Sequence, residues 1–485
     1  MQQAHEPAGA VHETHISYVI LLGDRAFKVK KPVKTGFLDW TTAAARASAC
    51  RREVALNRRL SPDVYLGVAR LTNERDAPCE HLVVMRRMAD QDRLSRLIEL
   101  GKDIDGGLRS LAREIAAFHA RGAMSAEIAA AGSAPRIGAL WELNVAELRP
   151  FTGTLLPAWA VERILALAER YLAGRGPLLE SRQAAGCVRD GHGDLLADDI
   201  FLTDDGPRVL DCLEFDDELR WGDVLADVAF LAMDLEHRGR SDLARRFLDE
   251  YGEFAAATWP ASLEHHYVAY RALVRSKVAC LRARQGDPRA ADEARSLLAQ
   301  CLRHLERGRV RLVLVGGEPG TGKSTLARRL GEAIDLAVLR SDEVRKELAG
   351  VGHQTSLRGD QSRWYGAAHS ASVYGELLER ARLALRRGTS VLIDASWADP
   401  DRRRQAAALA NQTAADLVQL RCSAPATVAD VRILGRMRDA SDADTDVAAR
   451  IRWEFAPWPE ATVIDTGGAL DDSVVAARRA LEAAP

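Results

Sequence analysis

The most specific chemical pattern in the chain is a glycine-rich segment that reads GEPGTGKS from Gly317 to Ser324. It matches G-x-x-x-x-G-K-[ST], in which the glycines let backbone N–H groups surround a phosphate, the lysine reaches the outer phosphates and the hydroxyl binds Mg²⁺. A glycine-rich turn without a ligand is the alternative. We predict that ATP and Mg²⁺ bind here, with Lys323 as a catalytic residue and Ser324 as a metal ligand. The predicted nucleotide-binding residues are Gly317, Glu318, Pro319, Gly320, Thr321, Gly322, Lys323, Ser324 and Thr325.

Two aspartates follow short apolar runs that are typical of buried strands. Asp342 comes directly after LAVLRS (336–341), and Asp394 lies in TSVLIDAS (389–396). Ligands of parallel α/β sheets gather at the carboxyl ends of the strands. We therefore predict that Asp394 holds Mg²⁺ and that Asp342 accepts the proton of a hydroxyl substrate, with Arg345 one turn away. A helix N-cap is the alternative for Asp342.

Two arginines, Arg432 and Arg436, lie one helical turn apart, and Arg438 follows closely. Arginines on one helix face are typical of a lid over a triphosphate, so we predict that Arg432 and Arg436 bind the nucleotide. A solvated helix face is the alternative, because the chain has 59 arginines and only eight lysines.

A second constellation lies in the N-terminal part. His192-Gly-Asp194 is followed by Asp199, and Asp211 comes 17 residues after Asp194, at the end of the apolar run PRVLD. The acids thus bracket a short predicted hairpin. Eukaryotic-type kinases have this layout, with one aspartate near the acceptor hydroxyl and a second on Mg²⁺.

The scarce lysines cluster upstream of these acids. Four of the eight are Lys28, Lys30, Lys31 and Lys34, and Glu53 lies in the next predicted helix. A strand lysine paired with a helix glutamate orients the α- and β-phosphates in kinases, so Lys28 or Lys30 is the candidate. In a chain that prefers arginine, the cluster indicates a need for a compact ammonium group.

The elements that must position these residues form two predicted domains. From residue 309 onward, apolar runs alternate with helical patterns, which predicts an α/β doubly wound parallel sheet. The first 305 residues predict an α+β bilobal fold: a hairpin turned at Gly23-Asp24, a helix, a strand over 81–88, and then mostly helices. We place the domains at 1–305 and 306–485.

The C-terminal domain resembles the small P-loop kinases of the polynucleotide-kinase, gluconate-kinase and chloramphenicol-phosphotransferase group. The phosphate loop, the S-D-x-x-R of residues 341–345 and the S-D-A of residues 441–443 carry this resemblance. It extends over about residues 309–480 and implies a P-loop kinase. It does not identify the acceptor.

The N-terminal domain resembles the aminoglycoside phosphotransferase and choline-kinase superfamily, and the whole chain resembles a bacterial group in which such a domain is fused to a P-loop kinase. The matching stretches are THISYVILLGDRAFKVKKPVKTGFLDW, REVALNRRLSPDVYLGV, HGDLLADDI and LDCLEFDDELRWGDVLADVAFL. The resemblance implies that Asp194 is the catalytic base, Asp211 a metal ligand, and Lys28 with Glu53 the pair at the phosphates.

Two positions depart from the family pattern H-G-D-L-H-x-x-N. Leu196 replaces the second histidine, and Asp199 replaces the metal-binding asparagine. Because aspartate is a competent Mg²⁺ ligand, we predict Asp199 as a metal ligand. A degenerate fold that binds without catalysis is the alternative. Downstream, we interpret Arg220, Asp223 and Asp227 as members of structural ion pairs.

Composition narrows the functional class. Apolar residues make up 47% of the 485 residues, charged residues 28%, and the net charge is −2. Nothing in this balance draws the chain to nucleic acid or membrane, and the seven dispersed cysteines and lack of a visible secretory signal predict a cytoplasmic protein. We predict an ATP-dependent kinase with two ATP·Mg²⁺ sites and small-molecule hydroxyl acceptors. The alternatives are a nucleotide-dependent regulatory protein and a C-terminal nucleotide or polynucleotide 5′-kinase.

Overall fold

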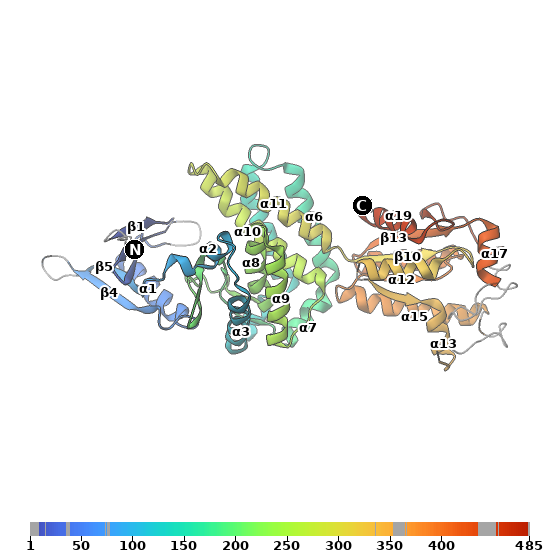
Figure 1. The fold of residues 1–485 in the computed structure, drawn as a ribbon, viewed down its shortest axis with the longest axis horizontal. Helices are drawn as coiled ribbons and strands as arrows, with labels where there is room; N and C mark the ends of the chain where they lie inside the picture. The colour runs from blue at the N-terminus through green and yellow to red at the C-terminus, as the bar shows by residue number, and fades with distance from the viewer. Residues whose placement is uncertain are drawn as a thin grey trace. The chain divides into compact units, whose positions relative to one another are not determined.

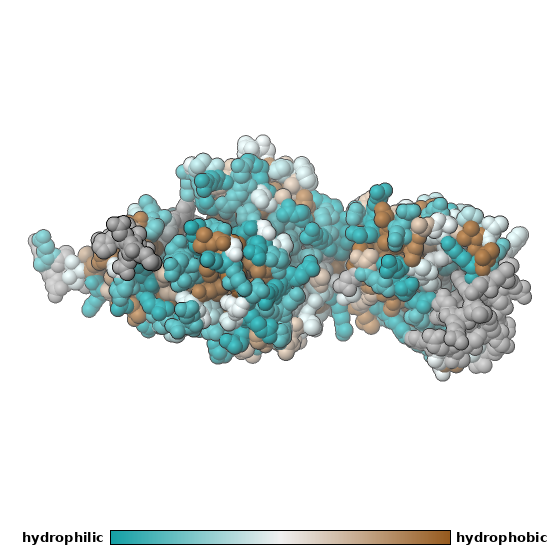
Figure 2. All heavy atoms as spheres, in the orientation of Figure 1, coloured by the Kyte–Doolittle hydropathy of each residue, from teal (hydrophilic) through white to brown (hydrophobic). Residues whose placement is uncertain are grey.

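The computed structural model describes residues 9–14, 16–34, 39–72, 74, 78–334, 336–352, 364, 366–434, 453 and 455–483. The chain divides into two compact units, each described separately below (Figure 1). The first comprises Met1–Glu162, Leu179–Trp259 and Tyr267–His304, and the second Arg163–Leu178, Pro260–His266 and Leu305–Pro485. None of the described helices combines the length and apolarity needed to cross a bilayer. The visible surface is largely hydrophilic, with separate small hydrophobic patches (Figure 2).

The first unit begins with a five-stranded antiparallel sheet in the order β1-β2-β3-β5-β4. Its elements are β1 (Ala10–Glu13), β2 (Ser17–Leu22), β3 (Arg25–Lys30), helix α1 (Ala43–Asn57), β4 (Tyr65–Thr72) and β5 (Pro78–Arg86). The hairpin β2–β3 turns at Gly23-Asp24 as predicted, and Gly23 has φ +58°, a left-handed conformation that suits glycine. The sequence pattern did not predict β1 and β4. Both are edge strands with many exposed positions, so neither shows a clear apolar alternation.

Helices make up most of the rest of the first unit, with two short hairpins among them. The helices are α2 (Leu94–Glu99), α3 (Asp105–Arg121), α4 (Ala126–Ala130), α5 (Ala134–Leu148), α6 (Ala158–Gly174), α7 (Gly176–Ala184), α8 (Val224–His237), α9 (Ser241–Ala255), α10 (Ala261–Arg284) and α11 (Ala290–Arg307). The hairpin strands are β6 (Val188–Asp190) with β9 (Trp221–Asp223), and β7 (Ile200–Thr203) with β8 (Gly206–Val209). Parts of α6, α10 and α11 belong to the second unit.

Helix α8 is the central helix of this part, because every residue from Leu225 to Leu235 is buried. A helix that is apolar on all sides is expected in a core. Two acids, Asp227 and Asp234, are buried in it nevertheless. Buried carboxylates require hydrogen-bonding partners, and both find them in the loop that follows β6.

The second unit contains a five-stranded sheet in the order β11-β12-β10-β13-β14, with every neighbouring pair parallel. The strands are β10 (Arg311–Gly316), β11 (Ala337–Arg340), β12 (Val391–Asp394), β13 (Asp416–Ser423) and β14 (Thr462–Asp465). The helices are α12 (Lys323–Ile334), α13 (Ser341–Leu348), α15 (Ala367–Arg386), α16 (Pro400–Gln412), α17 (Ala426–Leu434) and α19 (Leu470–Ala483). The predicted doubly wound parallel sheet is thus confirmed.

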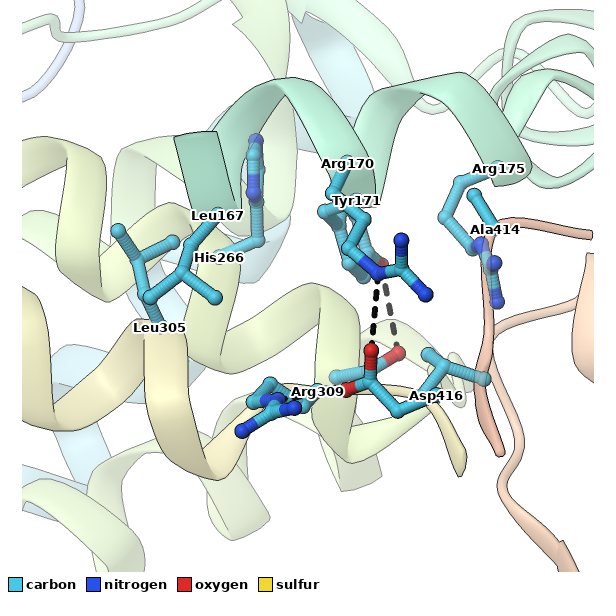
Figure 3. Close-up of a pocket in the computed structure, with 12 residues that line it drawn as sticks. Leu167, Arg170, Tyr171, Arg175, His266, Leu305, Arg309, Ala414 and Asp416 are labelled. Carbon is cyan, nitrogen blue, oxygen red and sulfur yellow. Dashed lines mark hydrogen bonds and ion pairs between the residues drawn. The ribbon is translucent and has the colours of Figure 1, made fainter. Parts of the chain in front are cut away.

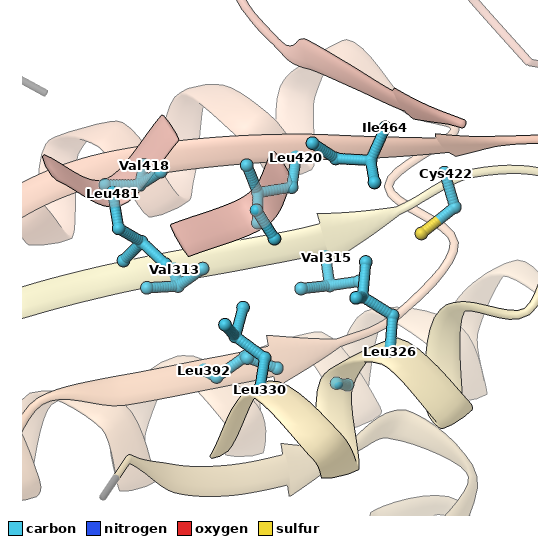
Figure 4. Packing of buried hydrophobic residues seen from close by; sticks show 12 residues of the cluster. Val313, Val315, Leu326, Leu330, Leu392, Val418, Leu420, Cys422, Ile464 and Leu481 are labelled. Carbon is cyan, nitrogen blue, oxygen red and sulfur yellow. The ribbon is translucent and has the colours of Figure 1, made fainter. Parts of the chain in front are cut away.

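The core of this sheet holds the strands and helices next to the phosphate loop together. Val313 and Val315 of β10 pack with Leu326 and Leu330 of α12, and these four side chains are fully buried (Figure 4). Leu392 of β12 completes this part of the cluster. Burying a side chain of this size stabilises the fold by roughly 1.5–3 kcal/mol. The core therefore holds β10, which precedes the glycine-rich loop, against α12, which follows it.

Candidate active sites

The lysines of β3 meet the glutamate of α1 in the interior of the first unit. Lys28 Nζ lies 3.0 Å from Glu53 Oε1 and 2.5 Å from Asp211 Oδ1. Burial alone would lower the pKa of Lys28, but the carboxylates of Asp211 and Glu53 raise it well above its usual value. The ammonium group therefore stays charged.

Lys30, which the sequence left as an alternative to Lys28, also contacts Glu53. Its Nζ lies 2.5 Å from Glu53 Oε2, forms an ion pair with Glu214 and lies 4.5 Å from the centre of the Trp40 ring. Glu53 thus divides its two oxygens between two lysines. Glu214 was missed in the sequence analysis, because nothing in its local pattern distinguishes it from the acids that follow.

The loop between β6 and β7 is held by a buried acid of α8. Asp227 accepts hydrogen bonds from the backbone N–H of His192 at 2.7 Å and of Gly193 at 2.8 Å. His119 Nε2 lies 2.9 Å from the same carboxylate. Burial would raise the pKa of Asp227, but the contact with His119 and the loop N–H groups lower it.

This finding adds to the sequence interpretation of Arg220, Asp223 and Asp227 as members of structural ion pairs. Arg220 and Asp223 do form ion pairs, Arg220 with Asp190 and Asp217, and Asp223 with Arg182. Asp227 pairs with His119, and it also binds the backbone of the loop that carries Asp194. The sequence signal was an acid inside a strongly apolar helix. A buried carboxylate needs a hydrogen-bond donor or a cation as its partner.

The three predicted acids of the first unit differ in their electrostatics. Burial raises the pKa of Asp194 to about 6, and the positive charges of Arg275 and Arg271 oppose this rise. Burial, with the charges of Asp211 and Asp194, raises the pKa of Asp199 well above its usual range. Burial also acts on Asp211, but Lys28 outweighs it and lowers the pKa of that carboxyl. The ionised carboxylates therefore repel one another, and either a cation or protonation of Asp199 relieves this repulsion.

Asp211 has a strained backbone. Its φ is +61°, which is uncommon for a residue other than glycine, and its N–H donates to the Tyr65 hydroxyl at 3.1 Å. Its side chain remains 47% exposed. Such strain is found where a side chain must point in one direction, here toward Lys28.

In the second unit, the predicted phosphate loop joins β10 to α12, and Lys323 is the first residue of the helix. Gly317 and Gly320 have φ of +136° and +85°. A Cβ at Gly320 would lie 2.5 Å from the carbonyl oxygen of Ala429, so no larger residue fits without a shift. Lys323 Nζ donates to the carbonyl oxygen of Glu318 at 3.0 Å, across the loop.

The acid at the end of β12 lies beside this loop. Burial raises the pKa of Asp394, while Lys323 and a hydrogen bond from Ser324 oppose the rise. Asp394 pairs in register with Val315 of β10 and with Arg340 of β11, so the ends of three strands meet here. A hydroxyl and a carboxylate in contact form the kind of oxygen donor set that Mg²⁺ prefers.

Asp342 lies in the first turn of α13, where its carboxylate binds Arg345 at 2.7 Å. The N-cap residue of this helix is Arg340, and no side chain caps it. The N-cap alternative for Asp342 is therefore wrong. Arg340 itself approaches the Asp394 carboxylate at 3.4 Å and the Glu343 carboxylate at 3.1 Å, whereas Asp342 pairs with Arg345.

The first of the two predicted lid arginines lies beside the phosphate loop. Arg432 donates to the carbonyl oxygen of Thr466 at 2.9 Å, and a Cβ at Gly322 would lie 3.4 Å from its Nη1 atom. Thr466 in turn donates to the carbonyl oxygen of Thr321 at 2.6 Å. Arg436, Arg438 and the S-D-A of residues 441–443 lie outside the described residues.

A cavity elsewhere in the second unit contains none of the predicted site residues. Arg170 points toward Asp416 and binds it at 2.8 Å, and Arg309 binds the same carboxylate at 2.5 Å (Figure 3). Arg175 donates to the carbonyl oxygens of Leu385 and Thr413. These polar groups bind one another across the cavity, which is consistent with a structural role.

Comparisons with known proteins agree with this division into two kinds of site. The phosphotransferase enzyme family matches residues 27–265, and the AAA domain family matches residues 312–458. An uncharacterized protein of Mycobacterium tuberculosis strain H37Rv is 44% identical over 470 residues, which cover 97% of this chain and 94% of that protein. An uncharacterized protein of Mycobacterium bovis matches to the same extent.

Two solved structures are similar to one part of the chain each. The GDP and kanamycin complex of an aminoglycoside phosphotransferase covers 61% of this chain and 94% of its own, with 16% identity and a TM-score of 0.41. A gluconokinase from Sinorhizobium meliloti covers 36% of this chain and 91% of its own, with 16% identity and a TM-score of 0.25.

Proposed function

Since the chain belongs to the same family as its mycobacterial relatives, and joins a phosphotransferase domain to a P-loop kinase domain, we propose that it is an ATP-dependent kinase with two separate ATP sites. Each site passes the γ-phosphoryl group to a hydroxyl of a small molecule. The supporting observation is that in each unit the charge of one lysine lowers the pKa of one aspartate of metal-ligand type. These pairs are Lys28 with Asp211 and Lys323 with Asp394.

In the first site, Asp194 accepts the proton of the acceptor hydroxyl. The hydroxyl oxygen forms a bond to the γ-phosphorus, the bond from that phosphorus to the β,γ-bridging oxygen breaks, and ADP leaves with the electron pair. With a pKa of about 6, Asp194 is ionised at neutral pH. This pKa is also near enough to neutral pH for the carboxylate to hold the proton that it accepts. Lys28, oriented by Glu53, binds the nucleotide phosphates, and Asp227 holds the loop in place.

In the second site, Asp342 accepts the acceptor proton, and Lys323 with the loop N–H groups binds the phosphates. Arg432 covers the loop from the side of Thr466. We extend this role to Arg436, one turn further along the sequence. Phosphoryl transfer requires positioning and charge neutralisation more than covalent chemistry, and these residue types supply both.

The donor sets of both sites suit Mg²⁺, which neutralises phosphate charge when it is bound. Ser324 and Asp394 would hold it in the second unit, and Asp199 and Asp211 in the first. Within the described ranges, no three or more His, Cys, Asp or Glu side chains form a metal site on their own.

The test separates the two sites within the full-length chain. ADP release is measured against a library of small hydroxyl compounds for the wild type, for Asp194→Asn, for Lys323→Ala and for the double variant. We expect each single variant to lose turnover of a different set of acceptors, and the double variant to lose all turnover. Turnover of no compound by the wild type, with ATP binding intact, would instead support a nucleotide-dependent regulatory protein.

A further inference from the structure

Two arginines of α10, Arg271 and Arg275, differ from three other arginines of the first unit in how their charges are compensated. Arg182, Arg220 and Arg238 each form ion pairs with aspartates. Arg271 and Arg275 have no carboxylate partner among the described residues. Both side chains are half-buried, so their charges are only partly exposed to water. A partly buried cation is stabilised by a nearby anion, and Asp194 is one such group because both charges lower its pKa.

Contacts with α8 place Arg271 near the loop that carries Asp194. Its Nε donates to the carbonyl oxygen of Ala226 at 2.9 Å, and its guanidinium lies 4.7 Å from the centre of the Phe230 ring. Ala226 directly precedes Asp227, which binds the N–H of Gly193. Arg271 therefore binds the turn of α8 in which Asp227 holds Gly193, the residue before Asp194.

Arg275 lies one helical turn further along α10, on the same face as Arg271. The loop also runs along α8, because the N–H of Ala197 donates to Asp234 at 2.9 Å, two turns after Asp227. In agreement with this placement, the charges of Arg275 and Arg271 lower the pKa of Asp194. The site thus has a lysine on its nucleotide side and two arginines on the side of the base.

We propose that Arg271 and Arg275 bind an anionic group of the phosphoryl acceptor, so that the compound phosphorylated at Asp194 carries a carboxylate or a phosphate in addition to its hydroxyl. This inference rests on the proposed kinase activity of the first site. A planar guanidinium donates two parallel hydrogen bonds to such an anion, which also orients the hydroxyl toward Asp194. The anion is not consumed: the hydroxyl proton passes to Asp194 and the new bond joins the hydroxyl oxygen to the γ-phosphorus.

Binding and turnover are tested in the full-length chain with Lys323→Ala, so that the second site is silent. The binding probes are inorganic phosphate and Mg·ATP, measured by calorimetry. The turnover probes are glycerol, glycerate and glycerol phosphate, which differ in charge but share hydroxyl groups. Arg275→Gln removes one guanidinium, and Arg284→Gln, at an exposed position of the same helix, is the matched control.

We expect phosphate to bind, the two anionic compounds to be preferred over glycerol, and Arg275→Gln to weaken phosphate binding by about tenfold, as the loss of a charge-assisted hydrogen bond implies. Arg275→Lys should recover part of this loss, and Arg284→Gln should change nothing. Loss of phosphate binding in Arg275→Gln without turnover of any compound would support the anion site while removing the proposed activity. Equal turnover of glycerol and the anions would overturn the inference but keep the kinase. If Arg275→Gln weakens the binding of Mg·ATP but not that of phosphate, the inference is overturned as well.

Discussion

Lys28 of β3 and Asp211, separated by 183 positions in the sequence, lie in direct contact, with 2.5 Å between Nζ and Oδ1. In the proposed reaction the lysine binds phosphate and the aspartate binds metal. Nucleotide and Mg²⁺ must therefore exchange this ion pair for two new contacts. The two ligands are expected to bind together, because breaking the pair for one alone leaves the other charge without compensation.

The third carboxylate of this site gives the first prediction. Asp199→Asn, in the full-length chain with Lys323→Ala, should make ATP binding less dependent on Mg²⁺ and leave activity equal or higher. The reason is that Asp199, Asp194 and Asp211 repel one another and the nucleotide unless a cation is present. ATP affinity is titrated with Mg²⁺ and with a chelator. If the chain that keeps Asp199 binds ATP equally well under both conditions, Asp199 does not face the nucleotide.

The pKa of Asp194 predicts a pH dependence. As a proton acceptor, Asp194 must be ionised, so kcat of the first site should rise with pH through about 6 and then level off. Arg275 and Arg271 lower this pKa, while burial, Asp211 and Asp234 raise it. Arg275→Gln should therefore move the rise to higher pH. If Arg275→Gln leaves the pH profile of kcat unshifted, the charge of Arg275 does not act on Asp194.

The buried carboxylate of Asp227 is predicted to contribute to both stability and catalysis. Asp227→Ala leaves the N–H groups of His192 and Gly193 without an acceptor, at a cost of about 1–3 kcal/mol each. Urea denaturation should show this loss. Asp227→Asn keeps one acceptor oxygen and should unfold later than Asp227→Ala, with kcat reduced and the KM for ATP little changed. A large rise in that KM would contradict a role limited to positioning the loop.

Lys323 should supply most of the nucleotide affinity of the second site. In the full-length chain with Lys28→Ala, which removes the phosphate-binding lysine of the first site, Lys323→Ala should weaken ATP binding at the second site by about tenfold or more, because a charged contact to phosphate is lost. Arg328→Ala, an exposed position of the same helix, is the control. Calorimetric affinity within twofold of the parent would make our interpretation of the loop wrong.

Asp342 and Asp394 should be separable in the same background. In the proposed reaction Asp342 contacts the acceptor and Arg345 but not the nucleotide, so Asp342→Asn should lower kcat while ATP affinity is kept. Asp394→Asn should instead raise the Mg²⁺ concentration needed for half-maximal activity, because Asp394 accepts the Ser324 hydrogen bond at the loop. Identical effects of the two changes would mean that the roles are not divided in this way.

Much of the fold could be predicted from local pattern. The five parallel strands each form a short apolar run, and the β2–β3 hairpin turns at a glycine with positive φ. The edge strands β1 and β4 could not be predicted, because an edge strand buries few side chains and shows no clear period. The buried helix α8 carries two acids whose partners are not visible in its own sequence.

By itself, the sequence determined the sites whose chemistry lies in a contiguous segment. The phosphate loop is such a segment, and its glycines and lysine act through spacing along one turn. The tertiary structure alone decided which lysines meet Glu53, that Asp227 holds the loop of Asp194, and that Arg271 binds the same turn of α8 as that loop. These contacts join residues far apart in sequence, and their energies depend on burial and on neighbouring charges, which exist only once the chain has folded.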